Sequence, residues 1–201
     1  TILENVRALP AGHYLVAERG ETRLVPYWGL APSPDGKWAE PGRDWAPRLR
    51  AALEESIRLH QVSDVSIGAF LSGGIDSSTV VALMARVSGQ RVKTFTVGFG
   101  SEGEALNELQ SARAMACRLE TDHTEVIVSA DSFRDELDRI VDALDQPTID
   151  GFNSYFVSKV ARTRVKVALS GLGGDELFAG YPHFQFLRTW TRRDKMWGRV
   201  P

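Results

Sequence analysis

The chain has 201 residues, of which 43% are hydrophobic and 25% are charged, and its formal net charge is −2 at pH 7; this composition is typical of a soluble globular protein. The near-neutral charge argues against a nucleic-acid partner, which would require a basic face, and no apolar run approaches the ~18 residues that span a bilayer. The single cysteine, Cys117, excludes an internal disulfide framework and favours a reducing compartment, so we expect a cytoplasmic protein with no nucleic-acid or membrane partner.

The first 45 residues differ in pattern from the rest of the chain. Two short apolar segments, 13–17 and 23–28, flank a turn around Gly20 and predict a β-hairpin. Residues 29–45 contain three of the nine prolines and three glycines, which is typical of a linker. We therefore divide the chain into a first segment at 1–30, a linker at 31–45 and a larger domain at 46–201.

The larger domain alternates between helical and strand patterns. Apolar residues recur at helical spacing in five segments, which begin at Leu49, Val80, Leu106 and Phe133 and, more weakly, near residue 153. Short apolar segments between them predict four strands, at 65–71, 92–97, 124–128 and 165–169. Strands separated by helices indicate βαβ units, so we predict an α/β fold with a parallel twisted sheet and helices on both faces. Ligands of such sheets bind beyond the carboxyl ends of the strands.

Two glycine-rich loops follow predicted strands at such positions. The first has the sequence FLSGGIDSS at 70–78, and the second has ALSGLGGDELFAGY at 168–181. Glycines and a helix N-terminus present backbone N–H groups to an anion, whereas Asp76 would repel a bare phosphate unless Mg²⁺ lay between them. The lysine of a Walker A loop is missing. Either loop alone is also typical of a strand–helix connection with a capping aspartate, but the pair favours a phosphate site.

These loops carry a family resemblance. The segment SGGIDS at 72–77 matches the pyrophosphate loop of the N-type ATP pyrophosphatases, and together with 170–181 it resembles the glutamine-hydrolysing asparagine synthetases. Three further segments fit that family, at 94–99, 121–123 and 145–148. The resemblance implies an adenine nucleotide alpha hydrolase-like fold for 46–201, and it implies that this domain is truncated.

The opening of the chain also resembles this family. Residues 6–13 and the pair Tyr27-Trp28 are similar to the carboxyl-terminal end of the family's glutaminase domain, most of which is absent here. The family's catalytic cysteine stands at the start of that domain, where this chain has Thr1. Cys117 lies within a predicted helix, and we expect it to be a packed thiol and not a nucleophile.

The resemblance implies ATP-dependent amide formation. The β-carboxylate of aspartate, or another carboxylate, would attack the α-phosphorus of ATP in the presence of Mg²⁺ and give β-aspartyl-AMP and pyrophosphate. Ammonia from a glutaminase domain would then displace AMP and give asparagine. The resemblance is also compatible with a homodimer.

The resemblance assigns roles to individual residues. The pyrophosphate ligands would be Ser72, Gly73, Gly74 and Ser77. The Mg²⁺ ligands would be Asp76 and Asp175, which form the expected catalytic set together with Glu176. The adenosine pocket would include Phe70 and Val97, and the ribose and α-phosphate would lie near Ser170 and Gly171.

Two positions depart from the family pattern. Leu172 stands where many members carry an acid that can assist proton transfer, and Asp150 stands where some carry an arginine near the amino-acid substrate. Both departures concern the substrate more than the ATP chemistry. They keep open a relative that closes an amide within a peptide or small molecule, as β-lactam synthetases and lasso-peptide cyclases do. A non-catalytic nucleotide-binding fragment is the third reading. Glu108, in a predicted helix, is expected on a solvated face, and the alternative is that it approaches the nucleotide.

Overall fold

The computed structural model describes residues 3–29, 44–100, 108–144, 148, 150–184 and 186. The chain forms two compact units, Thr1–Arg48 and Leu49–Pro201. Most of the predicted linker lies outside the described residues, as do the expected helix start at Leu106 and the family segment at 145–147.

The first unit contains the predicted hairpin. Strands β1 (His13–Glu18) and β2 (Glu21–Pro26) pair antiparallel, with Glu18 opposite Glu21. The two residues between the strands, Arg19 and Gly20, have φ angles of 54° and 82°. Two successive positive φ angles are the mark of a type I′ turn, whose twist matches that of the flanking strands. The prediction of a hairpin is thereby confirmed.

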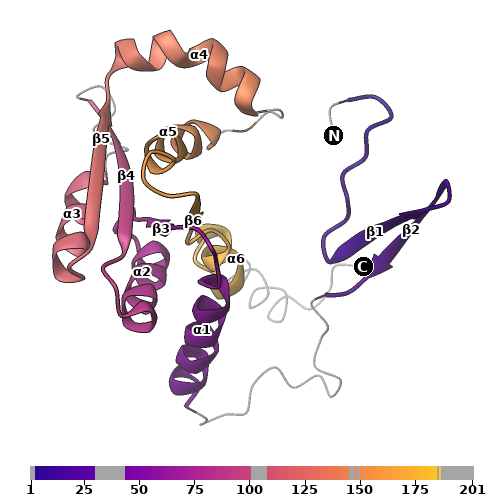
Figure 1. The fold of residues 1–201 in the computed structure, drawn as a ribbon, viewed down its shortest axis with the longest axis horizontal. Helices are drawn as coiled ribbons and strands as arrows, with labels where there is room; N and C mark the ends of the chain where they lie inside the picture. Colours follow the sequence, from indigo (N-terminus) through magenta and orange to yellow (C-terminus); the bar gives the residue numbers. More distant parts are fainter. Residues whose placement is uncertain are drawn as a thin grey trace, which may run out of the picture. The chain divides into compact units, whose positions relative to one another are not determined.

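The second unit is built on a four-stranded parallel sheet, as predicted (Figure 1). Its strands are β3 (Ile67–Phe70), β4 (Lys93–Phe99), β5 (Asp122–Val128) and β6 (Val167–Leu169). The order across the sheet is β5-β4-β3-β6, and every neighbouring pair is parallel.

Helices cover both faces of this sheet, which confirms the predicted fold class (Figure 1). The described helices are α1 (Ala46–His60), α2 (Ile75–Ser88), α3 (Leu109–Arg118), α4 (Ala130–Leu144), α5 (Gly151–Ala161) and α6 (Gly174–Phe178). One apolar cluster joins α1, α2 and α3 to the sheet through residues such as Ile57, Val81 and Ala112. Two further clusters join α4 and α5 to it, around Phe95 and Ile140.

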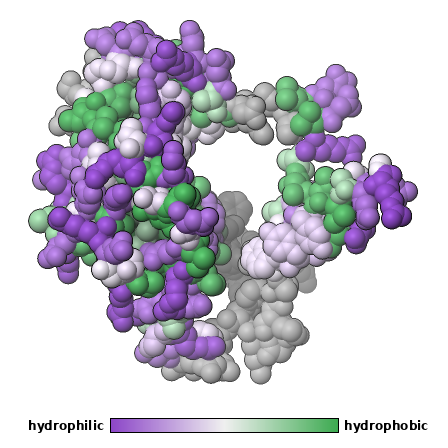
Figure 2. Space-filling view, viewed as in Figure 1, coloured by the Kyte–Doolittle hydropathy of each residue, from purple (hydrophilic) through white to green (hydrophobic). Residues whose placement is uncertain are grey.

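The helix α4 shows how this burial is patterned. Ile140 is fully buried, and Phe133 and Leu144 pack beside it, at intervals of seven and four residues along the helix. Hydrophilic residues cover the outer side of α4, and apolar residues gather beneath it (Figure 2). No helix among the described residues has both the length and the apolar character needed to cross a membrane.

The strand order creates a crevice at the carboxyl ends of β3 and β6. The chain proceeds from β3 through β4 to β5 in one direction and then returns to place β6 on the other side of β3. The connections that follow β3 and β6 therefore diverge at the carboxyl ends of two neighbouring strands. Such a switch point is where open α/β sheets bind their ligands, and both glycine-rich loops begin there.

One expectation about the helices was wrong. Cys117 lies in α3 as predicted, but its thiol is exposed and not packed. The helix directs Ala112 and Ala116 into the core, four residues apart, and the residue after Ala116 consequently faces solvent.

Candidate active site

The first loop is held in shape by its own hydroxyl groups. The Oγ atoms of Ser72 and Ser77 lie 2.9 Å apart, and the Ser72 N–H donates to Ser77 Oγ at 3.2 Å. The Gly74 N–H donates to Ser72 Oγ, also at 3.2 Å. Thr96 of β4 donates a hydrogen bond to the carbonyl of Leu71, which ties the end of β3 to its neighbour. The two serines thus link the loop to the first turn of α2.

The first turn of α2 is available to an anion. Gly74 is the N-cap residue and has an extended backbone. Because glycine has no side chain, it does not cap the N–H groups of the first turn. The first N–H groups of a helix have no partners within the helix, and they lie at the positive end of its dipole. An anionic ligand can therefore accept hydrogen bonds from this turn.

The second loop turns sharply after β6. The Leu172 N–H donates to Ser170 Oγ at 3.2 Å, and the Gly174 N–H donates to the Gly171 carbonyl at 3.2 Å. Gly173 has a φ of 97°, a value that residues with a Cβ atom rarely adopt. This geometry leads directly into α6 and places Asp175 in its first turn.

The two loops touch each other. A Cβ atom added to Gly171 would lie 2.7 Å from the Ser77 nitrogen and 3.1 Å from the Asp76 Cβ. A Cβ atom added to Gly174 would lie 2.9 Å from Asp76 Oδ1 and would collide with the rest of that carboxylate. Glycine at both positions is therefore what allows the Asp76 side chain to rest against the second loop.

A cleft of about 630 Å³ opens over this contact. Nine of the predicted site residues line it, namely Phe70, Ser72, Asp76, Ser77, Val97, Ser170, Gly171, Asp175 and Glu176. The other two, Gly73 and Gly74, belong to the first loop but do not line the cleft. Gly73 has a φ of 82° and packs against the backbone of Ser111 in α3.

The cleft also contains residues to which the sequence assigned no role. Tyr181 donates a hydrogen bond to Glu176 Oε1 at 2.9 Å, and this bond, together with burial and nearby carboxylates, raises the pKa of the Tyr181 phenol. Phe95, Thr96 and Asn153 line the walls. Tyr181 is the last residue of the second motif, so its position in that motif could have identified it as a site residue. Phe95 and Thr96 lie in the family segment at 94–99, which could have identified them, whereas Asn153 lies in α5 outside every motif.

Glu108 is exposed, as expected, and it also lines the cleft at the amino-terminal end of α3, as the alternative interpretation allowed. Asp150 lines the cleft from just before α5, and Leu172 lines it with 82% of its surface exposed. The two departures from the family pattern therefore both face the candidate site.

The charge of the cleft suits a cation bound with phosphate. Its described lining includes five carboxylates and no lysine, arginine or histidine. Asp76 and Asp175 come from the two touching loops. No group of three or more His, Cys, Asp or Glu side chains in the described part of the chain could enclose a metal ion. Mg²⁺ commonly takes one or two carboxylates and completes its shell with water and phosphate oxygens, so these residues fit that ion when a nucleotide is present.

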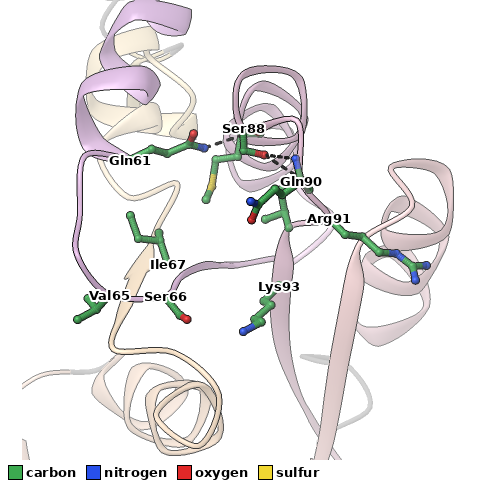
Figure 3. Close-up of a pocket in the computed structure, with 10 residues that line it drawn as sticks. Gln61, Val65, Ser66, Ile67, Ser88, Gln90, Arg91 and Lys93 are labelled. Atoms are coloured by element: carbon green, nitrogen blue, oxygen red, sulfur yellow. Dashed lines mark hydrogen bonds between the residues drawn. The ribbon is translucent and has the colours of Figure 1, made fainter.

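A second cavity, of about 240 Å³, lies at the amino ends of β3 and β4 (Figure 3). Two of its polar side chains are already engaged by the protein. The Gln61 amide donates to the Met84 carbonyl, and Arg91 extends away from the cavity and donates to the Glu120 carbonyl at 2.7 Å. This end of the sheet lies opposite the switch point, so the larger cleft is the better candidate.

Known proteins resemble this chain in sequence. A putative asparagine synthetase [glutamine-hydrolyzing] of Mycobacterium tuberculosis is 46% identical over 135 residues, which cover 66% of this chain and 20% of that protein. A putative asparagine synthetase [glutamine-hydrolyzing] 2 of Methanocaldococcus jannaschii is 34% identical over 186 residues, covering 90% of this chain and 35% of the relative. The chain thus spans only 20–35% of the length of these relatives.

Similarity to solved structures is weaker. An NH3-dependent NAD synthetase from Campylobacter jejuni is similar over 69% of this chain and 61% of its own, with 18% sequence identity and a TM-score of 0.46. The family model of asparagine synthase matches residues 48–200, which is most of the chain and includes both loops of the cleft. The chain belongs to the asparagine synthase family.

Proposed function

We propose that this chain is the ATP-binding part of a ligase that forms amides by transferring AMP to a carboxylate, with the β-carboxylate of aspartate as the expected substrate. The observation that carries the proposal is the contact between the two loops at the switch point, where the Asp76 carboxylate rests against Gly174. Membership of the asparagine synthase family and the names of the relatives support it.

The proposed reaction has two steps. In the first, a carboxylate oxygen attacks the α-phosphorus of ATP, the bond from that phosphorus to the bridging oxygen breaks, and pyrophosphate leaves. In the second, ammonia attacks the acyl carbon, and the carbon–oxygen bond to AMP breaks. A carboxylate is a poor acyl donor, and AMP gives it a good leaving group.

The main requirement of the first step is stabilisation of the departing pyrophosphate. In the proposal the N–H groups of the α2 first turn, together with the hydroxyls of Ser72 and Ser77, bind this group, because these donors are already oriented before the substrate arrives. Mg²⁺ would be held by Asp76 and Asp175 and would supply positive charge beside the phosphates. Phe70 and Val97, which line the cleft, would contact the adenosine.

The second step requires ammonia. We propose that a glutaminase domain supplies it, and that the hairpin of the first unit is the carboxyl-terminal end of that domain. The support is the sequence resemblance at 6–13 and the glutamine-hydrolysing activity named for the relatives. A cytoplasmic location belongs to the same proposal.

A second candidate concerns the substrate and not the ATP chemistry. Leu172 and Asp150 both line the cleft. An apolar side chain and a negative charge are poorly suited to bind the α-carboxylate of aspartate, which is the carboxylate that is not activated. This observation favours a relative that activates a different carboxylate, including one that closes an amide within a larger molecule.

The test is pyrophosphate exchange into ATP by the full-length protein, with Mg²⁺ and a panel of carboxylates. Adenylation predicts exchange that depends on one carboxylate, and amide formation then releases AMP. Exchange with aspartate supports the first candidate, whereas exchange only with another carboxylate supports the second. Release of ADP, or nucleotide binding without turnover for any carboxylate, would overturn both.

A further inference from the structure

The phosphate loop rests on a neighbouring helix. A Cβ atom added to Gly73 would lie 2.6 Å from both the carbonyl carbon and the Cβ atom of Ser111, and 2.7 Å from the nitrogen of Ala112. The backbone of the loop is therefore in direct contact with the first turns of α3. Because these atoms are already in close contact, a movement of α3 toward the loop must also displace the loop.

Apolar side chains hold α3 on the sheet. Leu109 and Ala112 are buried, and Met115 packs against the core cluster that includes Ala112. The residue next to Ala112 adds a directional link. Arg113 donates from Nε to Glu125 Oε1 at 3.0 Å and from Nη2 to Glu125 Oε2 at 2.6 Å. This two-bond geometry fixes both distance and orientation between α3 and β5.

The acceptor is itself fixed in place. The Glu125 side chain is only 20% exposed, and His123 Nε2 lies 3.3 Å from its Oε1 atom. The other ring nitrogen of His123 hydrogen-bonds Thr94 Oγ1 at 2.8 Å, and that hydroxyl also contacts Thr121 Oγ1 at 2.8 Å. The carboxylate thus lies against an imidazole that is hydrogen-bonded to β4 through its other nitrogen, and Arg113 reaches it from the helix that supports the loop.

We infer that Arg113 and Glu125 are positioning residues for ATP binding, which set the height of α3 and thereby the position of the phosphate loop. The inference rests on the proposed function, since it takes this loop to be the pyrophosphate site. Neither side chain lines the cleft, so the pair acts through Ser111 and Gly73 and not by contact with substrate.

A matched pair on the same strand provides the control. Arg164 donates from Nη1 and Nη2 to the two carboxylate oxygens of Asp122 at 3.0 Å and 2.6 Å, and its Nη1 also donates to Thr124 Oγ1. Arg164 follows α5, on the other face of the sheet from α3, and these hydrogen bonds go to β5 and not to α3. Arg113→Met and Arg164→Met therefore each remove a two-bond ion pair to β5, but only Arg113→Met removes one that holds α3.

The experiment measures pyrophosphate exchange by the full-length protein as a function of ATP concentration. Arg113→Met and Glu125→Gln should each raise the KM for ATP about two- to fivefold, with kcat changed less than about twofold, the scale of losing one ion pair whose arginine side chain is 66% exposed. The charge-exchanged double variant, Arg113→Glu with Glu125→Arg, should recover much of the lost affinity. Arg164→Met should leave the KM for ATP unchanged. Equal effects of Arg113→Met and Arg164→Met, or no recovery in the exchanged pair, would overturn the inference.

A second measurement does not depend on catalysis. Amide hydrogen exchange in the nucleotide-free protein should accelerate at 72–76 and 108–112 in Arg113→Met, and at neither segment in Arg164→Met. If the wild-type protein catalyses no exchange into ATP, the proposed function fails, and this measurement still decides whether the pair positions the loop. Unchanged protection of both segments in Arg113→Met would refute the positioning role by itself.

Discussion

Replacing Gly174 with alanine tests the contact on which the proposed site depends. The new Cβ atom would lie 2.9 Å from Asp76 Oδ1 and would overlap the rest of the carboxylate, which must retreat by about 1 Å to reach an ordinary contact distance of ~3.5 Å. Gly174 is not among the glycines with positive φ, so its backbone accepts alanine. The clash falls on the movable end of a side chain, and stability should therefore change little. A misplacement of about 1 Å at a reacting site costs on the order of 10²-fold in rate.

The assay is Mg²⁺-dependent pyrophosphate exchange by the full-length protein, together with urea unfolding. We expect Gly174→Ala to slow exchange about 100-fold and to require more Mg²⁺, while the unfolding midpoint stays near that of the wild type. Gly100→Ala is the control, because among the described residues its Cβ atom would meet nothing closer than the Val128 carbonyl at 3.9 Å. Wild-type exchange with unchanged Mg²⁺ dependence in Gly174→Ala would refute the view that the Asp76 carboxylate works from this position.

Three further outcomes are expected. Asp76→Asn should slow exchange by on the order of 10²–10³-fold, and adding Asp175→Asn should cost less than the sum, since both act through one ion; additive effects or a near-silent Asp76→Asn would contradict this. Burial lowers the pKa of His123, so the unfolded state binds the proton more readily, and the free energy of unfolding should fall by up to about 1.4 kcal/mol per pH unit below about pH 6.5. Urea unfolding should lose that slope in His123→Gln but not in His60→Gln, whose imidazole is exposed; equal slopes would contradict the assignment. Exposed Cys117 should react with a maleimide in the native protein, and Cys117→Ser should leave exchange unchanged.

Periodicity predicted the elements of the second unit well but placed some boundaries wrongly. Strand β5 was expected from residue 124 and begins at Asp122. Its first two residues are polar, so they lack the apolar pattern of a strand. They are nevertheless paired in register with Lys93 and Thr94, and their side chains bond Arg164 and Thr94. Interactions with residues distant in sequence, which a local pattern cannot show, extended this strand.

The sequence predicted the site residues that lie within a single motif. Each loop could be located after its strand, and nine of the eleven expected residues line one cleft. What the sequence could not show is which surfaces of the loops meet. The contact between Asp76 and Gly174 joins residues almost 100 positions apart and exists only because β6 lies beside β3. The support of Gly73 by α3 is likewise a consequence of packing and has no sequence signature.

Three glycines determine how this site is assembled, and each does so through a different neighbour. Gly73 meets α3, Gly171 meets the backbone at Ser77, and Gly174 meets the Asp76 carboxylate. At each contact the missing Cβ lets a backbone approach closer than any other residue would allow. The contacts are also unequal in kind: two are against backbone, which cannot yield, and one is against a side chain, which can. Substitutions at Gly73 and Gly171 should therefore disturb folding and binding together, whereas substitution at Gly174 should separate them, because of these three contacts only this one lets the fold survive while the carboxylate is moved.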